Sequence, residues 1–264
     1  MESTGIRTLN CPNCGAPVGS GDLNCDYCGG AIYAGQAAEI TVPAVAQAQK
    51  IIPEMQRRIQ ENPYDGEAYY RLGLACYTLQ LYDEAEHAFV QARRFSPGSA
   101  VVFYFTGLAM LRQAEREILS IQEYRIVQIR EQFETAAELD PNMNLARVYL
   151  ELTNALRART HEDYAGALKP LQAVTAALPK LGVAWKVLAA CHFQVGDYGR
   201  AIEAGCQAFE IDPKDPDVAY LVGSAYSRLG ETDRMESWAR RVARLRNHPD
   251  RWREVVREFK GLFE

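Results

Sequence analysis

The sequence lacks the features that would place it in a membrane, an export pathway or a nucleic-acid complex. None of its apolar runs approaches the roughly 18 residues that a membrane span needs. The first residues, Met1–Gly5, have neither a basic start nor an apolar stretch, so we expect no secretory signal and a cytoplasmic protein. Basic residues are not in excess, and the formal net charge of -5 does not favour nucleic-acid binding.

Catalytic motifs are missing as well. The sequence contains no Gly-x-Ser-x-Gly, no phosphate-binding loop and no His-Glu-x-x-His. His192 is expected on the inner side of a helix and is interpreted as a packing residue rather than a base or a ligand. Cys76, Cys191 and Cys206 stand among apolar residues in helical segments, where we expect buried, inert thiols. The sequence therefore predicts a protein that is not an enzyme.

Two cysteine pairs lie within the first 28 residues. Cys11 and Cys14 form one C-x-x-C, and Cys25 and Cys28 form the other. Four thiolates on two such turns are the tetrahedral ligand set of a structural zinc ion, and so short a segment needs the metal to fold. A redox dithiol and an iron site are the weaker alternatives. We expect one structural Zn2+ within residues 1–33.

The same four cysteines match the ligands of the small zinc ribbons found at the start of many bacterial proteins, which residues 8–33 resemble. The resemblance implies a zinc-held module and says little about a partner. Residues 1–33 carry only Arg7 against three acidic side chains, so a phosphate backbone would be poorly neutralised. The following residues, 34–43, have no strong period and are interpreted as a linker.

From residue 44 onward the sequence is helical in pattern and repeats itself. Five prolines each end a helix, at spacings of 34, 44, 38 and 34 residues, and they are Pro63, Pro97, Pro141, Pro179 and Pro213. A small residue recurs in the first helix of four of the pairs, where it would let the two helices of a hairpin approach closely, at Gly73, Gly107, Ala189 and Gly223. The second helix opens with Tyr-x-x-Ala at Tyr82, Tyr164 and Tyr198.

Two stretches, Gly66–Tyr77 and Gly182–Ala189, resemble the consensus of the tetratricopeptide repeat. The resemblance covers about residues 64–245, and it implies an all-α solenoid of about five helical hairpins wound into a right-handed superhelix. We expect a capping helix over 44–63 and another over 246–264, because terminal repeats otherwise expose an apolar face.

Two repeats exceed the period of 34 residues. Ten extra residues in the second repeat predict a protruding hairpin tip with its turn near 118–121. Ser120 and Glu123 are expected to form a capping box at that turn, and Thr160 with Asp163 a similar one in the third repeat.

The tetratricopeptide resemblance places the first helix of each hairpin along a concave groove. Its inward positions are aromatic and aliphatic, unlike the basic and asparagine-rich set with which family members grip a C-terminal carboxylate. Such a surface suits an amphipathic helix or an extended apolar peptide, and we expect its tyrosines to be at least partly accessible. The residues expected to bind a protein or peptide partner are Tyr70, Leu74, Tyr77, Tyr104, Leu108, Lys186, Tyr220 and Arg228. In the alternative, the long second hairpin or the linker fills the groove.

These patterns together predict a non-catalytic interaction scaffold or adaptor, with the groove as its binding surface and the zinc ribbon as a docking module. The arginines of the last helix are interpreted as part of a solvated cap, offset by Glu254 and Glu258, rather than as a nucleic-acid or lipid patch. Two other functions stay open. One is a nucleic-acid-associated regulator that uses the zinc ribbon, and the other is an accessory subunit of an enzyme complex.

Overall fold

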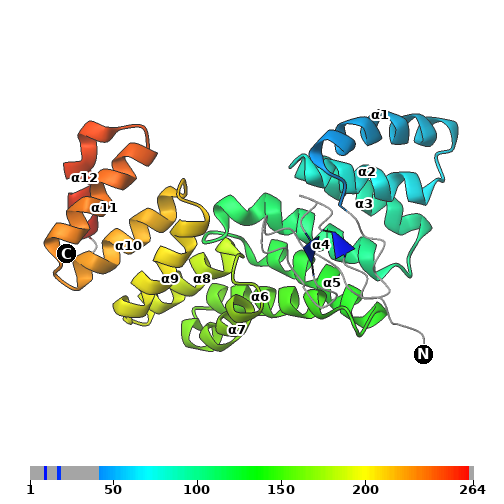
Figure 1. Ribbon diagram of the computed structural model, residues 1–264. Helices are drawn as coiled ribbons and strands as arrows, with labels where there is room; N and C mark the ends of the chain where they lie inside the picture. The colour runs from blue at the N-terminus through cyan, green and yellow to red at the C-terminus, as the bar shows by residue number, and fades with distance from the viewer. Residues whose placement is uncertain (1–8, 11–16, 19–41, 262–264) are drawn as a thin grey trace, which may run out of the picture. The chain divides into compact units, whose positions relative to one another are not determined.

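Helices make up almost all of the described structure. The computed structural model describes residues 9–10, 17–18 and 42–261, and within them twelve α-helices follow one another along the chain (Figure 1). The predicted helical-repeat fold is confirmed for this part of the chain. The helices are α1 (Val45–Glu61), α2 (Gly66–Thr78), α3 (Tyr82–Phe95), α4 (Ala100–Ala114), α5 (Glu123–Leu139), α6 (Asn144–Thr160), α7 (Tyr164–Ala177), α8 (Gly182–Gln194), α9 (Tyr198–Ile211), α10 (Pro216–Arg228), α11 (Thr232–Leu245) and α12 (Trp252–Gly261).

Short elements accompany the helices. Two 3-10 turns, η1 (Glu115–Glu117) and η2 (Pro249–Arg251), follow α4 and precede α12. Two strands of two residues, β1 (Leu9–Asn10) and β2 (Pro17–Val18), pair antiparallel. No helix in the range 42–261 combines the length and apolarity that crossing a membrane would require.

The chain divides into two compact units. The first contains the described residues up to Ala114 together with Glu131–Ala146, and the second contains Glu115–Arg130 together with the residues from Arg147 onward. In the first unit α1 packs on α2, α2 on α3 and α3 on α4. In the second, each helix from α7 to α12 packs on the next one along the chain. This neighbour-on-neighbour packing is what a repeat of short helical hairpins predicts.

Prolines and aspartates set the helix boundaries. The helices α1, α3, α5, α7 and α9 each end two residues before one of the five periodic prolines, as expected from the steric limit that proline places on the preceding residue. Four first turns are capped by an aspartate whose carboxylate accepts a backbone N–H, and these residues are Asp65, Asp163, Asp197 and Asp215. The local sequence therefore fixes where most of these hairpins turn.

A glycine lies against a phenylalanine ring at three helix crossings. A Cβ added to Gly73 would lie only 2.5 Å from Phe89 Cε1, so nothing larger than hydrogen fits there. The same close approach recurs for Gly107 with Phe133 and for Gly223 with Phe259. All three rings are fully buried. The predicted role of the small residue, to let two helices approach closely, is confirmed at these positions.

Neither predicted capping box forms. Helix α5 begins at Glu123, two residues later than a cap at Ser120 requires, and Ser120 Oγ instead donates a hydrogen bond to the carbonyl oxygen of Glu117 at 3.2 Å. In the third repeat Thr160 is the last residue of α6, and Asp163 itself caps α7. The turn of the second repeat nevertheless falls where it was predicted, between α4 and α5.

The prediction of a protruding tip on the second hairpin is wrong. Ile118 and Ile121 in this turn are buried, with 0% and 8% of their surface exposed. Arg159 of α6 donates hydrogen bonds to the carbonyl oxygens of Leu119, at 2.7 Å, and of Ile118, at 2.9 Å. Burial of these two isoleucines holds the turn within the second unit, while the polar residues Arg116 and Glu117 stay exposed.

We expect Gly73→Ala to lower the free energy of unfolding by about 1–3 kcal/mol, because the new methyl group would overlap the Phe89 ring and force the helices apart. Chemical denaturation of the purified chain measures the effect. Gly98→Ala is the matched control, since a Cβ there meets no atom within 4 Å. Equal stability of the two variants would show that the glycine–phenylalanine contact does not set the helix spacing.

Candidate protein-binding surfaces

Three residues predicted to line the groove in the first unit are buried. Only 3% of the surface of Tyr104 is exposed, against 5% for Leu74 and 6% for Leu108. The Tyr104 ring meets the rings of Phe105, at 5.3 Å, and Phe133, at 6.1 Å between centroids. The expectation that Tyr104 is accessible is therefore wrong, because its ring belongs to the packed interior of this unit.

The other two predicted tyrosines of the first unit are half-buried. The Tyr70 ring lies 6.2 Å from that of Phe89, and its hydroxyl oxygen is buried without a hydrogen-bond partner among the described residues. Burial raises the pKa of Tyr70 well above its usual value. The Tyr77 hydroxyl accepts a hydrogen bond of 3.4 Å from Arg112 Nε, and its ring packs edge-on against Phe105. Both residues keep part of their surface accessible.

Lys186 was expected to face a partner, but its ammonium group is held within the second unit. The residue is 3% exposed, and its Nζ lies 2.8 Å from Asp215 Oδ2 and 3.1 Å from Asp217 Oδ2. Asp215 also caps α10 through its other carboxylate oxygen. Lys186 therefore ties α8 to the first turn of α10, since a buried ammonium requires carboxylate partners.

The last two predicted residues lie at the surface of the second unit. Tyr220 is half-buried, with its ring 5.0 Å from that of Phe259 and the guanidinium of Arg246 above it at 5.3 Å. Burial raises the pKa of Tyr220. Arg228 is exposed, and its guanidinium lies 5.9 Å from the centroid of the Tyr198 ring.

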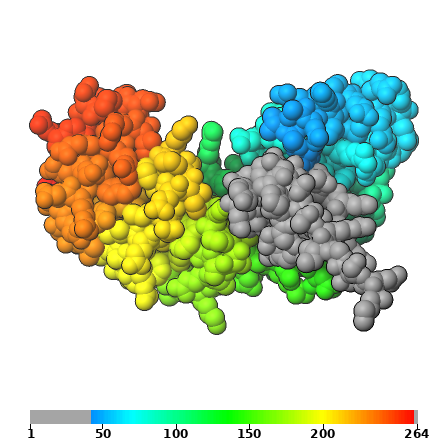
Figure 2. Space-filling model, viewed as in Figure 1, coloured from blue at the N-terminus to red at the C-terminus, as the bar shows by residue number. Residues whose placement is uncertain are grey.

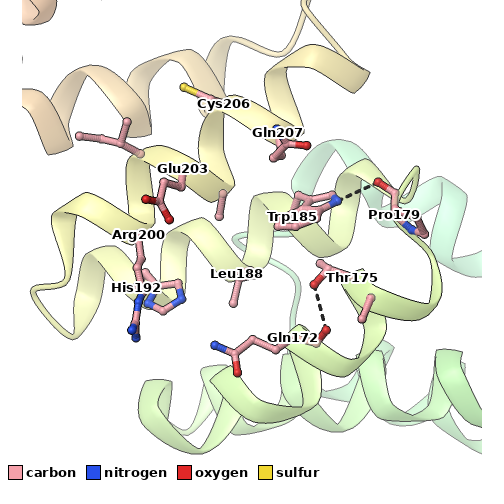
Figure 3. A pocket seen from close by; sticks show the side chains of 13 residues that line it. Gln172, Thr175, Pro179, Trp185, Leu188, His192, Arg200, Glu203, Cys206 and Gln207 are labelled. Atoms are coloured by element: carbon pink, nitrogen blue, oxygen red, sulfur yellow. Dashed lines mark hydrogen bonds between the residues drawn. The ribbon is translucent and has the colours of Figure 1, made fainter.

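A hollow of about 870 Å³ opens in the second unit between α7, α8 and α9 (Figure 3). Most of its wall is apolar, and Trp185 of α8 forms one side. The Trp185 indole N–H donates a hydrogen bond of 2.9 Å to the carbonyl oxygen of Pro179, which fixes the orientation of the ring. The other residues that line the hollow are Gln172, Thr175, Ala176, Leu188, His192, Arg200, Ile202, Glu203, Ala204, Cys206 and Gln207.

His192 and Thr175 are the buried polar residues of this wall, and His192 is the ionisable one. It is 3% exposed, and its Nδ1 has no hydrogen-bond partner among the described residues. The nearest carboxylate oxygen, Asp197 Oδ2, lies 3.9 Å away, which is too far for a hydrogen bond. Burial lowers the pKa of His192, so the ring is neutral near pH 7. The interpretation as a packing residue fits this burial.

The hollow lies in the space where the helices of one repeat meet those of the next, which we call a seam. The equivalent seam one repeat later along the chain shows which side chains would fill the hollow. Positions 34 residues after Thr175, Ala204 and Gln207 are Phe209, Trp238 and Arg241. In that seam the Phe209 and Trp238 rings pack edge to face at 5.1 Å, and the guanidinium of Arg241 lies 4.9 Å and 4.6 Å from their centroids. Thr175, Ala204 and Gln207, which are smaller or uncharged, leave the seam between α7, α8 and α9 open. The hollow was not predicted from the sequence, although an alanine at 204, one repeat before the tryptophan at 238, indicates a missing ring.

The four predicted zinc ligands, Cys11, Cys14, Cys25 and Cys28, lie outside the described residues. The strands β1 and β2 are described on either side of the first pair, and their register places Leu9 opposite Val18 and Asn10 opposite Pro17. Among the remaining described residues there is no group of three or more His, Cys, Asp or Glu side chains placed to bind a metal.

Replacement of Lys186 by alanine is expected to lower the free energy of unfolding by about 1–3 kcal/mol, because Asp215 and Asp217 would lose their shared cation. Thermal or chemical denaturation provides the measurement, and Lys214→Ala, at an exposed lysine, is the control. Unchanged stability in Lys186→Ala would mean that the pair does not hold α8 to α10.

Comparison with known proteins supports the repeat. Residues 66–97 match the model of the tetratricopeptide repeat. Over 89 residues the chain is 34% identical to the general transcriptional corepressor ssn6 of Schizosaccharomyces pombe. That match spans 33% of this chain and only 8% of the corepressor.

Two solved structures share the arrangement of helices. PilW, a widely conserved type IV pilus biogenesis factor, aligns with a TM-score of 0.56 at 16% identity, over 80% of this chain and 91% of PilW. A chain of the APC/C hetero-tetramer Cut9-Hcn1 aligns with a TM-score of 0.55 at 12% identity, over 81% of this chain and 46% of that chain. At these identities the likeness concerns the fold alone. Residues 66–97 are thus a tetratricopeptide repeat, and the helices around them have the fold of tetratricopeptide-repeat proteins.

Proposed function

We propose that this chain is a non-catalytic cytoplasmic scaffold that binds a segment of a partner protein, with the hollow between α7, α8 and α9 as its principal binding site. The observation that carries the proposal is the contrast between two equivalent seams. One contains its own aromatic rings, and the other is open and bordered by Trp185. Repeat folds of this kind present surfaces for protein partners.

The chemistry of the hollow indicates the kind of side chain that enters it. Phe209 and Trp238 occupy the equivalent space one repeat later, so the open seam has room for an aromatic or large aliphatic side chain. Burial of such a side chain against Trp185 and Leu188 supplies the hydrophobic contribution to binding. Gln172, Glu203 and Gln207 can then bond to the polar backbone of the same partner segment.

Only half of the residues predicted to line the groove remain accessible to a partner. Tyr70, Tyr77, Tyr220 and Arg228 retain accessible surface and could contact a partner, whereas Leu74, Tyr104, Leu108 and Lys186 are buried. Within each unit this leaves a sparse set of contacts rather than a continuous apolar groove. A partner helix or peptide held in the hollow is therefore the better-supported form of the proposal.

The zinc ribbon remains part of the proposal as a docking module with one structural Zn2+. Its support is the cysteine spacing together with the antiparallel pairing of β1 and β2, because these strands bring the chain back on itself on either side of Cys11 and Cys14. A turn of this kind fits two thiolates on one metal face. Once bound, the metal would supply the folding free energy of the small module and no chemistry.

Filling the hollow should abolish binding there. In the double variant Thr175→Phe with Ala204→Trp, the side chains of the next seam are installed, and affinity for hollow-binding peptides should fall at least about tenfold, or about 1.4 kcal/mol. Peptides selected from a displayed library on the unmodified chain, with an aromatic residue at a fixed position, are the probes, and calorimetry measures their affinity.

Ala173→Trp is the matched control for this experiment. It adds the same ring at an exposed position of α7 that does not line the hollow, so affinity should be unchanged. Selected peptides that bind the filled variant as tightly as the unmodified chain would place the binding site elsewhere, first at the accessible groove tyrosines.

The metal proposal predicts about one zinc per purified chain, measured by elemental analysis, and loss of the zinc in Cys11→Ser with Cys25→Ser. Far-ultraviolet circular dichroism should change little on metal removal, because the helices from α1 to α12 bury apolar cores of their own. Stoichiometric iron would contradict the assignment, and a general loss of helix on chelation would show that the ribbon and the helices fold together.

A further inference from the structure

Two arginines from different helices meet over one tryptophan at the C-terminal end of the described chain. The guanidinium carbon of Arg240 in α11 lies 4.4 Å from the centroid of the Trp252 ring, and that of Arg253 in α12 lies 5.3 Å from it. Trp252 is half-buried, while both arginines are exposed. An aromatic face attracts cations, and two guanidiniums near one ring concentrate positive charge there.

Further cations continue this surface along both helices. Arg244 lies one helical turn after Arg240, and its Nε bonds to the Arg240 carbonyl oxygen at 3.3 Å. On α12, Arg257 and Lys260 follow Arg253 at spacings of four and three residues, which places all three on one exposed stripe. We name this surface the C-terminal basic face, made up of Trp252, Arg240, Arg244, Arg253, Arg257 and Lys260.

The carboxylates nearby do not neutralise this face. Glu254 and Glu258 were expected to offset the arginines of α12, but they pair instead with Arg251, at 3.8 Å, and with Arg246, at 2.9 Å. Glu236 pairs with Arg240 at 3.0 Å and is the one carboxylate in an ion pair with the face among the described residues. The cations of Arg244, Arg253, Arg257 and Lys260 form no ion pair within residues 42–261. Their charge is complementary to an acidic ligand.

The size and surroundings of the face favour a short acidic protein segment. The two helices have 14 and 10 residues, and at a rise of about 1.5 Å per residue they offer a stripe of about 15–20 Å. A stripe of this length accommodates a segment of a few residues, whereas most of a long polyanion would lie beyond it. In Figure 2 the two helices, coloured orange to red, form part of the surface of the molecule.

We propose that the C-terminal basic face is a second docking site, separate from the hollow, that binds an acidic segment of a partner protein. Aspartate or glutamate side chains of that segment accept paired hydrogen bonds from the guanidiniums of Arg244, Arg253 and Arg257. An apolar side chain between them rests against the exposed part of Trp252. The site goes beyond the proposed function, because it binds a different chemistry on different helices.

Fluorescence anisotropy of the full chain with a short labelled peptide of alternating glutamate and leucine tests the proposal. The peptide should bind, more weakly at higher salt, and a peptide with glutamine in place of glutamate should bind at least about tenfold more weakly. Arg244→Ala with Arg253→Ala should lower the affinity about tenfold. Arg244→Lys with Arg253→Lys keeps the charges and should restore part of the lost affinity, and this pair also controls for a misfolded cap.

Two further variants separate binding at this face from a general effect of charge and from binding in the hollow. Lys169→Ala with Lys214→Ala removes the same charge at exposed positions elsewhere in the second unit and should leave the affinity unchanged. Thr175→Phe with Ala204→Trp fills the hollow and should also leave it unchanged, so a failure of the proposed function does not affect this result.

Four outcomes would overturn the proposal. They are no binding of the glutamate peptide, an equal loss of affinity in the lysine control pair, tighter binding of a single-stranded oligonucleotide or of phosphatidylserine vesicles than of the peptide, and self-association of the chain that the arginine-to-alanine pair abolishes. The last two would assign the face to a different macromolecule or to a second copy of this chain.

Discussion

The spacing between packed helices is set where a glycine faces a phenylalanine ring, and the rest of the repeat structure depends on that spacing. With only hydrogen at Gly73, the backbone of α2 comes close enough for the Phe89 ring to fill the space between α2 and α3. The ring is completely buried, so the close approach and the hydrophobic contribution arise from the same contact. The contact recurs at Gly107, between α4 and α5, and at Gly223, between α10 and α12.

The hairpin of α8 and α9 meets the same constraint differently, and the hollow lies beside it. Here an alanine, Ala189, occupies the glycine position and Gly205 faces it, and a Cβ added to Gly205 would lie 2.5 Å from Val222 Cγ2 of the next helix. Trp185 of this hairpin borders the hollow. One repeat later the aromatic rings lie inside the seam. The residues at the three equivalent positions, Phe209, Trp238 and Arg241 against Thr175, Ala204 and Gln207, thus decide whether the seam is filled or open.

Charged side chains have two roles in the second unit, and whether a side chain is buried or exposed determines its role. Lys186 is enclosed and held by two aspartates, so it joins two helices and cannot contribute to recognition. The arginines of the C-terminal basic face are exposed, and the neighbouring glutamates pair mostly with other arginines. A surface ion pair contributes little to stability, so the unbalanced cations place little demand on the fold while keeping their charge for a ligand.

Much of the fold followed from the sequence, because its signals are local. Prolines such as Pro97 and Pro213 end helices through a steric clash with the preceding residue. A glycine such as Gly73, recurring at the repeat period, marks a position where two helices approach closely. The expected capping role of Ser120 failed, because a capping motif identifies a possible hydrogen bond but does not exclude a competing one with Glu117.

The binding surfaces were predictable only in part. The helical period predicted the faces of α4 and α8 on which Tyr104 and Lys186 lie, but it could not predict which residues pack against those faces. Tyr104 proved to be part of an aromatic core, and Lys186 to be paired with Asp215, which lies 29 residues further along the chain. The sequence by itself determined the repeat, its boundaries and the cysteine pattern of the expected zinc site. Only the tertiary structure decided which side chains are buried, which carboxylate pairs with which cation and which seam stays open, because these depend on contacts between residues that are distant in sequence.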